Sequence, residues 1–91
     1  MIAKNIRING LVQGVFFRAT TKEKADELGI KGWVRNCRRR NDGVKIFAEG
    51  DEESMKKFLD WCHEGPSGAQ VEEVEIADAK EENSTSFEVT E

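Results

Sequence analysis

The spacing of apolar residues changes several times along the chain, and each change predicts a new secondary-structure element. Residues 6–12 alternate between apolar and polar positions, which is typical of a strand with one buried face. Residues 17–28 have their candidate core positions three or four residues apart, which indicates a helix, and Gly29 after them is a typical helix-ending residue. These positions are Ile6, Ile8, Gly10 and Val12 in the strand and Phe17, Thr21, Ala25 and Leu28 in the helix.

A hairpin and a second helix are predicted next. Residues 31–36 and 44–49 have strand patterns, and the Asn-Asp-Gly turn sequence at 41–43 between them predicts that the two strands form a hairpin. Asp51 is a good N-cap for the second helix, which the Gly-Pro pair at 65–66 ends. The apolar face of that helix holds Met55, Phe58, Leu59 and Cys62.

The end of the chain predicts two more strands and completes the fold class. Val71, Val74 and Ile76 mark a fourth strand whose alternation breaks once, as it does at a β-bulge. Phe87 and Val89 mark a short final strand. The order βαββαβ with a terminal strand predicts an α+β sandwich of the ferredoxin-like type. In it, two helices cover one face of an antiparallel sheet of four to five strands.

The first strand leads into the first helix through a short loop that has the features of an anion site. Residues 10–18 read Gly-Leu-Val-Gln-Gly-Val-Phe-Phe-Arg. Backbone N–H groups at a helix N-terminus bind anions, Gly14 permits close approach of the backbone, and Arg18 supplies a planar fork for two phosphate oxygens. Asn36 ends the second strand. In the predicted fold both strands end at the same sheet edge with one strand between them, so the two side chains lie about 10 Å apart at the backbone.

The residues missing from this region narrow its chemistry. Val12 and Arg18 have the spacing of the cysteine-based phosphatases, but valine occupies the position of the nucleophile. The sequence also has no Ser-His pair, no carboxylate cluster with metal-ligand spacing and no Walker lysine loop. Direct attack by water remains, and the amide of Asn36 can orient a water molecule without acting as a base.

Residues 10–18 together with the Gly-Trp-Val-Arg-Asn segment at 32–36 resemble the signature of the acylphosphatase family. The stretch Trp-Cys-x-x-Gly-Pro-x-Gly-Ala-x-Val-Glu at 61–72 is also familiar in that family. The resemblance implies a metal-free and cofactor-free hydrolase that converts small acyl phosphates to carboxylate and inorganic phosphate. It implies that Arg18 binds the phosphoryl group and that Asn36 positions the water. The implied substrate-binding segment is Gln13, Gly14, Val15, Phe16, Phe17 and Arg18.

One segment departs from the family pattern. Many members continue from this asparagine as Asn-x-x-Asp-Gly, whereas here a longer, basic connection covers residues 37–42. It could change the angle of the Asn36 side chain or the access of large substrates. Phe16 and Phe17 are expected to be packing residues, with Phe16 as a candidate for the pocket mouth, and Trp33 is expected to be a hydrophobic anchor.

Two other functions stay open as alternatives. The three arginines at 38–40 invite a nucleic-acid interpretation, since ferredoxin-like sheets also carry RNA-recognition modules. The sequence lacks the stacking aromatics and the basic-glycine-aromatic opening of those modules, so a solvated hairpin tip is favoured. The other alternative is a non-catalytic phosphate-binding domain with the same loop.

Composition adds the size and the expected location. The chain has 91 residues, 37% hydrophobic and 35% charged, which leads us to expect one domain over residues 1–91 and a monomer. No apolar run approaches the roughly 20 residues that span a bilayer, and no secretory leader is recognisable, so a cytoplasmic protein is expected. Cys37 and Cys62 are expected as free thiols, although a disulfide between them stays open, and His63 is expected at the surface.

Charge is distributed unevenly between the two halves of the sequence. Residues 1–45 carry eleven Lys or Arg and four acidic residues, whereas residues 46–91 carry three and fourteen. The basic half contains the anion loop and would attract an anionic substrate. Strands from both halves can also interleave and cancel the difference, and the sequence leaves both outcomes open.

Overall fold

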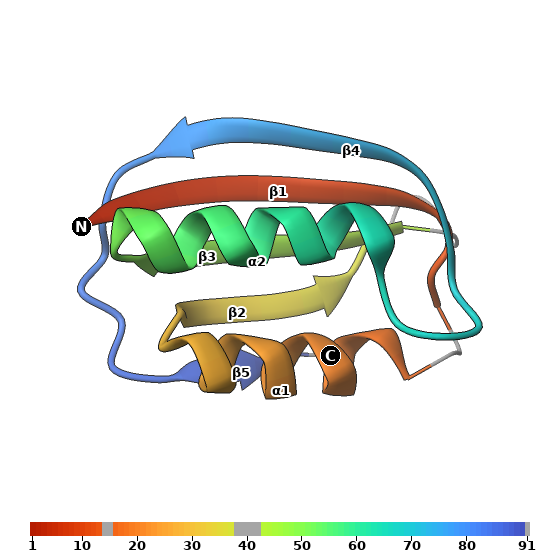
Figure 1. Cartoon of the computed structure of the whole chain (residues 1–91), viewed down its shortest axis with the longest axis horizontal. Coiled ribbons are helices and arrows are strands. Elements are labelled where there is room, and N and C mark those ends of the chain that lie inside the picture. The colour runs from red at the N-terminus through yellow and green to blue at the C-terminus, as the bar shows by residue number, and fades with distance from the viewer. Residues whose placement is uncertain (14–15, 38–42, 91) are drawn as a thin grey trace.

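The computed structural model describes residues 1–13, 16–37 and 43–90. Two helices and five strands alternate along the chain (Figure 1). The elements are β1 (Ile2–Leu11), α1 (Phe17–Leu28), β2 (Lys31–Asn36), β3 (Gly43–Gly50), α2 (Glu52–Glu64), β4 (Gln70–Ala79) and β5 (Phe87–Val89). The predicted bounds of the first helix are confirmed. The first strand begins four residues before the predicted range 6–12 and ends one residue before its end, the fourth extends past Ile76 to Ala79, and the other elements differ by at most one residue at an end.

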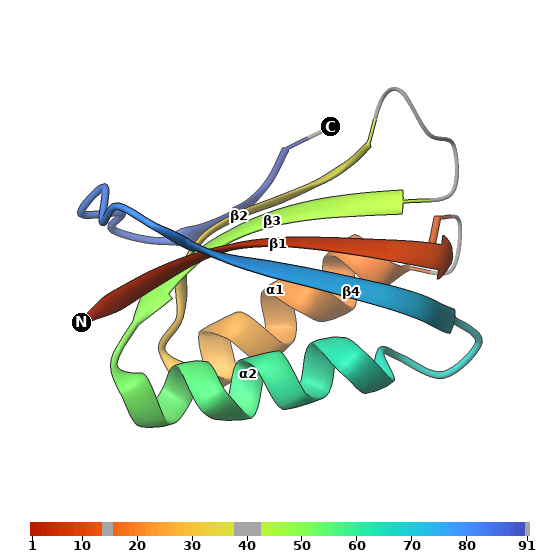
Figure 2. The ribbon, with the colours of Figure 1, turned by 90° about the horizontal axis from the view of Figure 1, so that it is seen from above.

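The five strands form one sheet in the order β4-β1-β3-β2-β5, and both helices pack on the same face of it (Figure 2). The predicted fold class is confirmed. One pairing differs from the expected antiparallel sheet, because β5 runs parallel to β2 with Val34 opposite Val89, so the sheet is mixed. The predicted hairpin of β2 and β3 is confirmed, while its connection at residues 38–42 lies outside the described residues.

The core lies between the sheet and the two helices. The predicted periodicity explains it, because each strand turns alternate side chains toward the helices and each helix turns one stripe toward the sheet. Phe58 of α2 packs its ring against Phe87 of β5 and against Trp61. The buried cluster consists of Ile6, Ile8, Val12, Phe17, Ala25, Ile30, Val34, Val44, Ile46, Ala48, Met55, Phe58, Cys62 and Phe87.

Local signals in the sequence set the ends of the helices. Gly29 follows α1 with φ 74°, a left-handed conformation that glycine adopts without strain, and its N–H bonds back to the last turn. Asp51 caps α2, since its carboxylate accepts a hydrogen bond of 2.8 Å from the Ser54 N–H. Both predicted helix signals are confirmed.

The predicted bulge lies where β1 and β4 pair. Asn9 pairs with Glu73 but Gly10 pairs with Val71, so β4 has one extra residue at this point. Gly10 has φ 134°, and a Cβ there would lie 2.1 Å from the Gln70 carbonyl oxygen, so only glycine fits. The bulge bends the end of β1, where the chain leaves the sheet toward α1.

A buried carboxylate holds the connection between β4 and β5. Glu49 of β3 accepts hydrogen bonds from the backbone N–H groups of Glu82, at 3.0 Å, and Ser84, at 2.7 Å. Burial opposes ionisation of Glu49, but the hydrogen bonds from Ser84 and Glu82 outweigh it and hold the pKa of this carboxyl below its ordinary value. Glu49 thus fixes the segment that leads into β5.

The structure also answers two questions that the sequence left open, the state of the two cysteines and the placement of the charged halves in the sheet. Cys37 and Cys62 are both free, and burial raises the pKa of the Cys62 thiol to about 12. The strands of the two halves interleave, which is one of the two outcomes left open: β1 and β2 come from the basic first half, β4 and β5 from the acidic second half, and β3 lies mostly in the second half. Within the described ranges, neither helix is long and apolar enough to cross a membrane.

Candidate active site

A pocket of about 350 Å³ lies where α1 begins and β2 ends. Figure 1 shows why the two meet: β1 and β2 run in the same direction with β3 between them, and α1 begins at the end where both strands finish. The predicted meeting of Arg18 and Asn36 is confirmed, because both side chains line this pocket. Its lining consists of Val12, Phe16, Phe17, Arg18, Ala19, Asn36 and Val89.

The N-terminus of α1 faces this pocket with the features of an anion site. Phe16 is the N-cap residue, it makes no side-chain capping bond, and the first turn holds no acidic residue. The first intrahelical bond runs from the Thr20 N–H to the Phe16 carbonyl at 3.0 Å. An α-helix leaves the N–H groups before that bond without intrahelical partners, and here they belong to residues 17–19. Together with the positive end of the helix dipole they favour a bound anion.

Arg18 and Asn36 approach the pocket from different elements. Arg18 lies in the first turn of α1 and is half-buried, and Asn36 is the last residue of β2 and is also half-buried. Asn36 pairs with Val44 of β3, so its backbone is fixed in the sheet up to the edge of the pocket. Among the described residues, the site therefore combines one cationic side chain with one neutral amide.

Gln13 connects the loop before α1 to the hairpin beside Asn36. Its side-chain N–H donates to the Gly43 carbonyl at 2.7 Å, and the same carbonyl accepts from the Cys37 N–H at 2.9 Å. The two hydrogen bonds meet on one oxygen next to the end of β2. This contact fixes Gln13 relative to the end of β2, a bracing role that the residue type alone did not indicate.

The other predicted substrate-binding residues fall into three groups. Gly14 and Val15 lie outside the described residues. Phe17 is buried against Trp61, at 5.7 Å between ring centroids, so it can offer only its backbone to the pocket. Phe16 is 83% exposed, so the interpretation of its side chain as a packing residue is wrong, while its place in the pocket lining agrees with the expected pocket mouth.

Val12, Ala19 and Val89 line the pocket but were not among the predicted site residues. Val89 reaches it because β5 runs parallel to β2, which brings the end of β5 to the same side of the sheet as Asn36. The alternation of Phe87 and Val89 indicated which face these residues occupy, but not the strand beside them. The sequence pattern did not predict that β2 is the strand next to β5.

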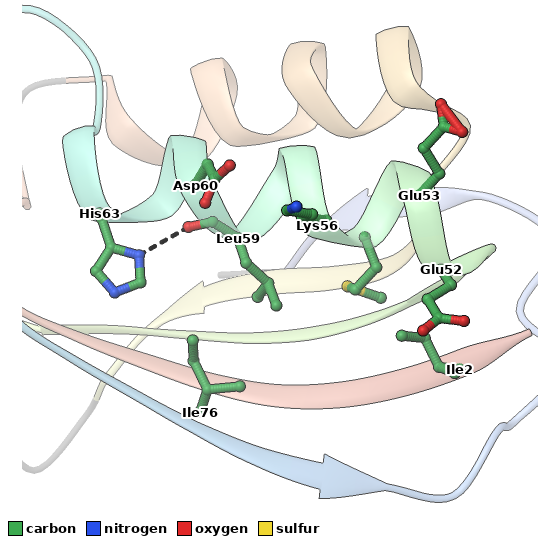
Figure 3. Close-up of a pocket in the computed structure, with 9 residues that line it drawn as sticks. Ile2, Glu52, Glu53, Lys56, Leu59, Asp60, His63 and Ile76 are labelled. Atoms are coloured by element: carbon green, nitrogen blue, oxygen red, sulfur yellow. Dashed lines mark hydrogen bonds between the residues drawn. The ribbon is translucent and has the colours of Figure 1, made fainter.

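A larger groove, of about 600 Å³, lies along the opposite side of the helical layer (Figure 3). Apolar side chains of Ile2, Met55, Leu59 and Ile76 form its inner surface. Its rim holds Glu52, Glu53, Lys56, Asp60 and His63, all exposed. The ring of His63, found at the surface as predicted, lies 2.9 Å from the Leu59 carbonyl oxygen through Nδ1.

The pocket and the groove differ in the charge of the groups around them. The rim of the groove holds three carboxylates and one ammonium group, so a phosphoryl group would be repelled there. The pocket at α1 offers Arg18 and a helix N-terminus instead. In the described parts of the chain no three His, Cys, Asp or Glu side chains gather in a group that could hold a metal ion. The smaller pocket is therefore the candidate active site.

Comparison with known proteins places the chain in a family. The model of the acylphosphatase family matches residues 4–89. An acylphosphatase from Acidovorax sp. (strain JS42) is 46% identical over 96% of this chain and 88% of its own length. The crystal structure of the Bacillus subtilis acylphosphatase superposes with a TM-score of 0.94 at 28% identity, covering 100% of both chains. The Coxiella burnetii acylphosphatase gives 0.91 at 34% identity, covering 98% of this chain and 92% of that one. The chain belongs to the acylphosphatase family, whose enzymes hydrolyse acyl phosphates.

Proposed function

We propose that this chain hydrolyses acyl phosphates by direct in-line attack of water on phosphorus. Arg18 and the backbone N–H groups at the start of α1 bind the phosphoryl group, and Asn36 positions the water. The observation that carries the proposal is the shared pocket, in which a guanidinium, a helix N-terminus and an amide face the same space. Without the family membership, the same geometry would support phosphate binding alone.

The phosphoryl group is bound through the positive charge of Arg18 and through backbone N–H groups that point toward it. The guanidinium of Arg18 can donate two parallel hydrogen bonds to two phosphoryl oxygens. The N–H groups of residues 17–19 point along the helix axis toward the same anion. Predicted contributions from the backbone of Gly14 and Val15 concern residues outside the described ranges. In the transition state, charge is spread over these oxygens, and donors already held in place around them stabilise it.

Attack by the water and departure of the leaving group require few further catalytic groups. The Asn36 amide both donates and accepts hydrogen bonds, so it can hold a water molecule in line with the bond to be broken. The leaving group is a carboxylate whose conjugate acid has a pKa of about 4, so it departs without a general acid. Water adds to phosphorus, the P–O bond to the acyl group breaks with its electron pair leaving on the carboxylate, and the attacking water gives one proton to solvent while its other proton stays on the phosphate. The products are carboxylate and inorganic phosphate.

Several features of the surroundings support this assignment of roles. Gln13 donates to the Gly43 carbonyl at the start of β3, which holds the chain just after β1 beside the end of β2 that carries Asn36. Cys37 follows Asn36 directly, and its sulfur accepts a hydrogen bond of 3.2 Å from Arg7, which anchors the strand end. One domain over residues 1–91, a monomeric state and a cytoplasmic location remain predictions from the sequence.

Isotope labelling tests the proposal most directly. The purified chain is incubated with benzoyl phosphate and a metal chelator in water enriched in oxygen-18, and both products are analysed by mass spectrometry. Attack on phosphorus places the label in inorganic phosphate, whereas attack on the carbonyl carbon places it in benzoate. We expect turnover with label in the phosphate.

Two results would overturn parts of the proposal. Label in benzoate would exclude attack on phosphorus, although hydrolysis itself would stand. Phosphate binding by the well-folded chain without turnover of benzoyl phosphate would indicate a binding module instead of an enzyme. Calorimetric titration with inorganic phosphate in parallel separates that case from a misfolded sample.

A further inference from the structure

The pocket has an apolar rim that the binding of a phosphoryl group does not use. Phe16 is 83% exposed and Val89 is 41% exposed, and both line the pocket beside Arg18 and Asn36. We propose that Phe16 and Val89 form a subsite for the acyl group, and that the chain prefers acyl phosphates with an extended apolar acyl group. This inference rests on the proposed function, because it concerns the other end of the same substrate.

The backbone of Phe16 supports a functional reason for its exposure. Phe16 has φ 59° and ψ 25°, the left-handed region that bulky residues rarely adopt. Such a conformation is unfavourable for phenylalanine, and its exposed ring gains nothing from the core. Its neighbour Phe17 shows the alternative, because it is buried in the core next to Trp61. A strained residue with an exposed aromatic ring at a pocket is a candidate for contact with a ligand.

Val89 contributes from a different element. It belongs to β5, and its partner Val34 on β2 lies two residues before Asn36. Backbone bonds hold this end of β5, since the Thr90 N–H donates to the Val34 carbonyl at 2.9 Å. Val89 is therefore presented by the edge of the sheet, whereas Phe16 is presented by the start of α1. Two exposed apolar groups on separate elements thus border one pocket.

The polar and the apolar lining residues divide the pocket into a part for the phosphoryl group and a part for the acyl group. Arg18 and Asn36 are the polar side chains of the described lining, and both are assigned to the phosphoryl group and the water. The other described lining residues are apolar, so an acyl group that extends from the phosphate meets carbon on several sides. At about 350 Å³ the pocket has room for more than the five heavy atoms of a phosphate group.

A series of acyl phosphates of increasing length tests the subsite. We would measure kcat/KM for acetyl, butyryl and hexanoyl phosphate, corrected for spontaneous hydrolysis. Each buried methylene strengthens binding by about twofold to fourfold, so the wild type should prefer hexanoyl over acetyl phosphate by about tenfold or more. Selectivity, the ratio between two substrates, is the readout because it is independent of the fraction of active protein.

Three variants locate the effect. Phe16→Asn removes the ring but keeps a residue that tolerates the left-handed conformation, and Val89→Ser removes the second apolar group. Each should lower the hexanoyl-to-acetyl ratio by about threefold or more. Ile76→Ser is the matched control, since Ile76 is also a strand residue, is 39% exposed and lines the other groove. It should leave the ratio unchanged.

The possible outcomes separate this inference from the proposed function. Absence of turnover with all three substrates would overturn the proposed function. Turnover of all three at similar kcat/KM, or a preference that both variants leave intact, would overturn the subsite and leave the hydrolase. A preference for an acyl phosphate with a second anionic group over hexanoyl phosphate would overturn it as well, because it would require a cation at the acyl end.

Discussion

The pocket at the start of α1 and the groove along α2 differ in the chemistry of their walls more than in their shape. The groove is the larger, at about 600 Å³ against about 350 Å³. Its inner surface is apolar and its rim is mainly acidic, with the carboxylates of Glu52, Glu53 and Asp60 and one lysine, Lys56. The pocket combines Arg18, Asn36 and a helix N-terminus. Size alone would have selected the wrong hollow for an anionic substrate.

The comparison also shows what topology contributes to each hollow. The groove gathers neighbours on one helix, with side chains one turn apart along α2 and strand residues beneath them (Figure 3). The pocket gathers the ends of three elements that are distant in sequence, α1, β2 and β5. Residues at the ends of elements can point at one ligand from several directions, which a catalytic site requires. We therefore expect substitutions in the pocket to affect rate and substitutions in the groove to affect stability.

The largest expected effect comes from removing the cation of the pocket. Arg18→Ala should lower kcat/KM for benzoyl phosphate by about 1,000-fold, with a higher KM and a lower kcat, because a bidentate charged contact to the phosphoryl group is lost. Lys56→Ala removes the cation of the groove and is the matched control, expected within about twofold of wild type. Steady-state kinetics on both variants measures the contrast. Equal losses would contradict the assignment of the site.

Substitution of a buried groove residue should have the opposite effect: it should lower the stability of the fold and leave the activity nearly unchanged. Met55 is fully buried on the groove side of α2. Met55→Ala should lower the free energy of unfolding by about 3 kcal/mol through loss of contacts and a residual cavity. The folded variant should keep kcat/KM within about twofold of wild type. Urea unfolding and kinetics below the transition provide both numbers, with Met55→Leu as the control that conserves volume. A tenfold loss of kcat/KM in the folded variant would show that this groove residue affects catalysis in the pocket, and it would contradict the expected separation of the two regions.

The water-positioning role is expected to appear in the rate constant. Asn36→Ala should lower kcat by about 100-fold with KM for benzoyl phosphate nearly unchanged, since the amide acts on the attacking water and not on the bound phosphoryl group. Asn5→Ala changes an exposed strand asparagine and should have no effect. A higher KM at unchanged kcat would instead assign Asn36 to substrate binding.

The sequence predicted most of the fold because its signals are local. The spacing from Phe17 to Leu28, the glycine after it and the cap at Asp51 each depend on neighbours within a few residues, and all three are confirmed. The meeting of Arg18 with Asn36 followed from one topological rule applied to those elements. Their chemical roles are still predictions.

The features that the sequence did not predict depend on distant contacts. Alternation assigned Val89 to a face but could not show that β5 runs parallel to β2, so its place at the pocket was missed. The pair Phe16 and Phe17 has two identical side chains, and only the left-handed backbone at Phe16 determines which one leaves the core. The missed position of Val89 and the wrong packing role for the Phe16 side chain both concern the proposed acyl subsite.

The smallest expected effect concerns the anchoring of β5, which forms a wall of the pocket but not of the groove. Glu49→Gln should lower the free energy of unfolding at pH 7 by about 1.5 kcal/mol, because an amide cannot accept from both Glu82 and Ser84 as the carboxylate does. Since the pKa of Glu49 is lowered in the folded state, its ionised form stabilises the fold above its ordinary pKa of about 4.3. This stabilisation is lost as the pH falls through the folded-state value.

The difference between wild type and Glu49→Gln should therefore shrink as the pH falls below about 4.3, which urea unfolding at pH 7, 5, 4 and 3 would measure. Glu81→Gln changes an exposed carboxylate in the same connection and should differ little from wild type at any of these values. A constant difference from pH 7 to pH 3 would show that the carboxylate charge is not what holds this segment. The selectivity for hexanoyl over acetyl phosphate should fall in Glu49→Gln as well, because a looser β5 presents Val89 less firmly to the acyl group.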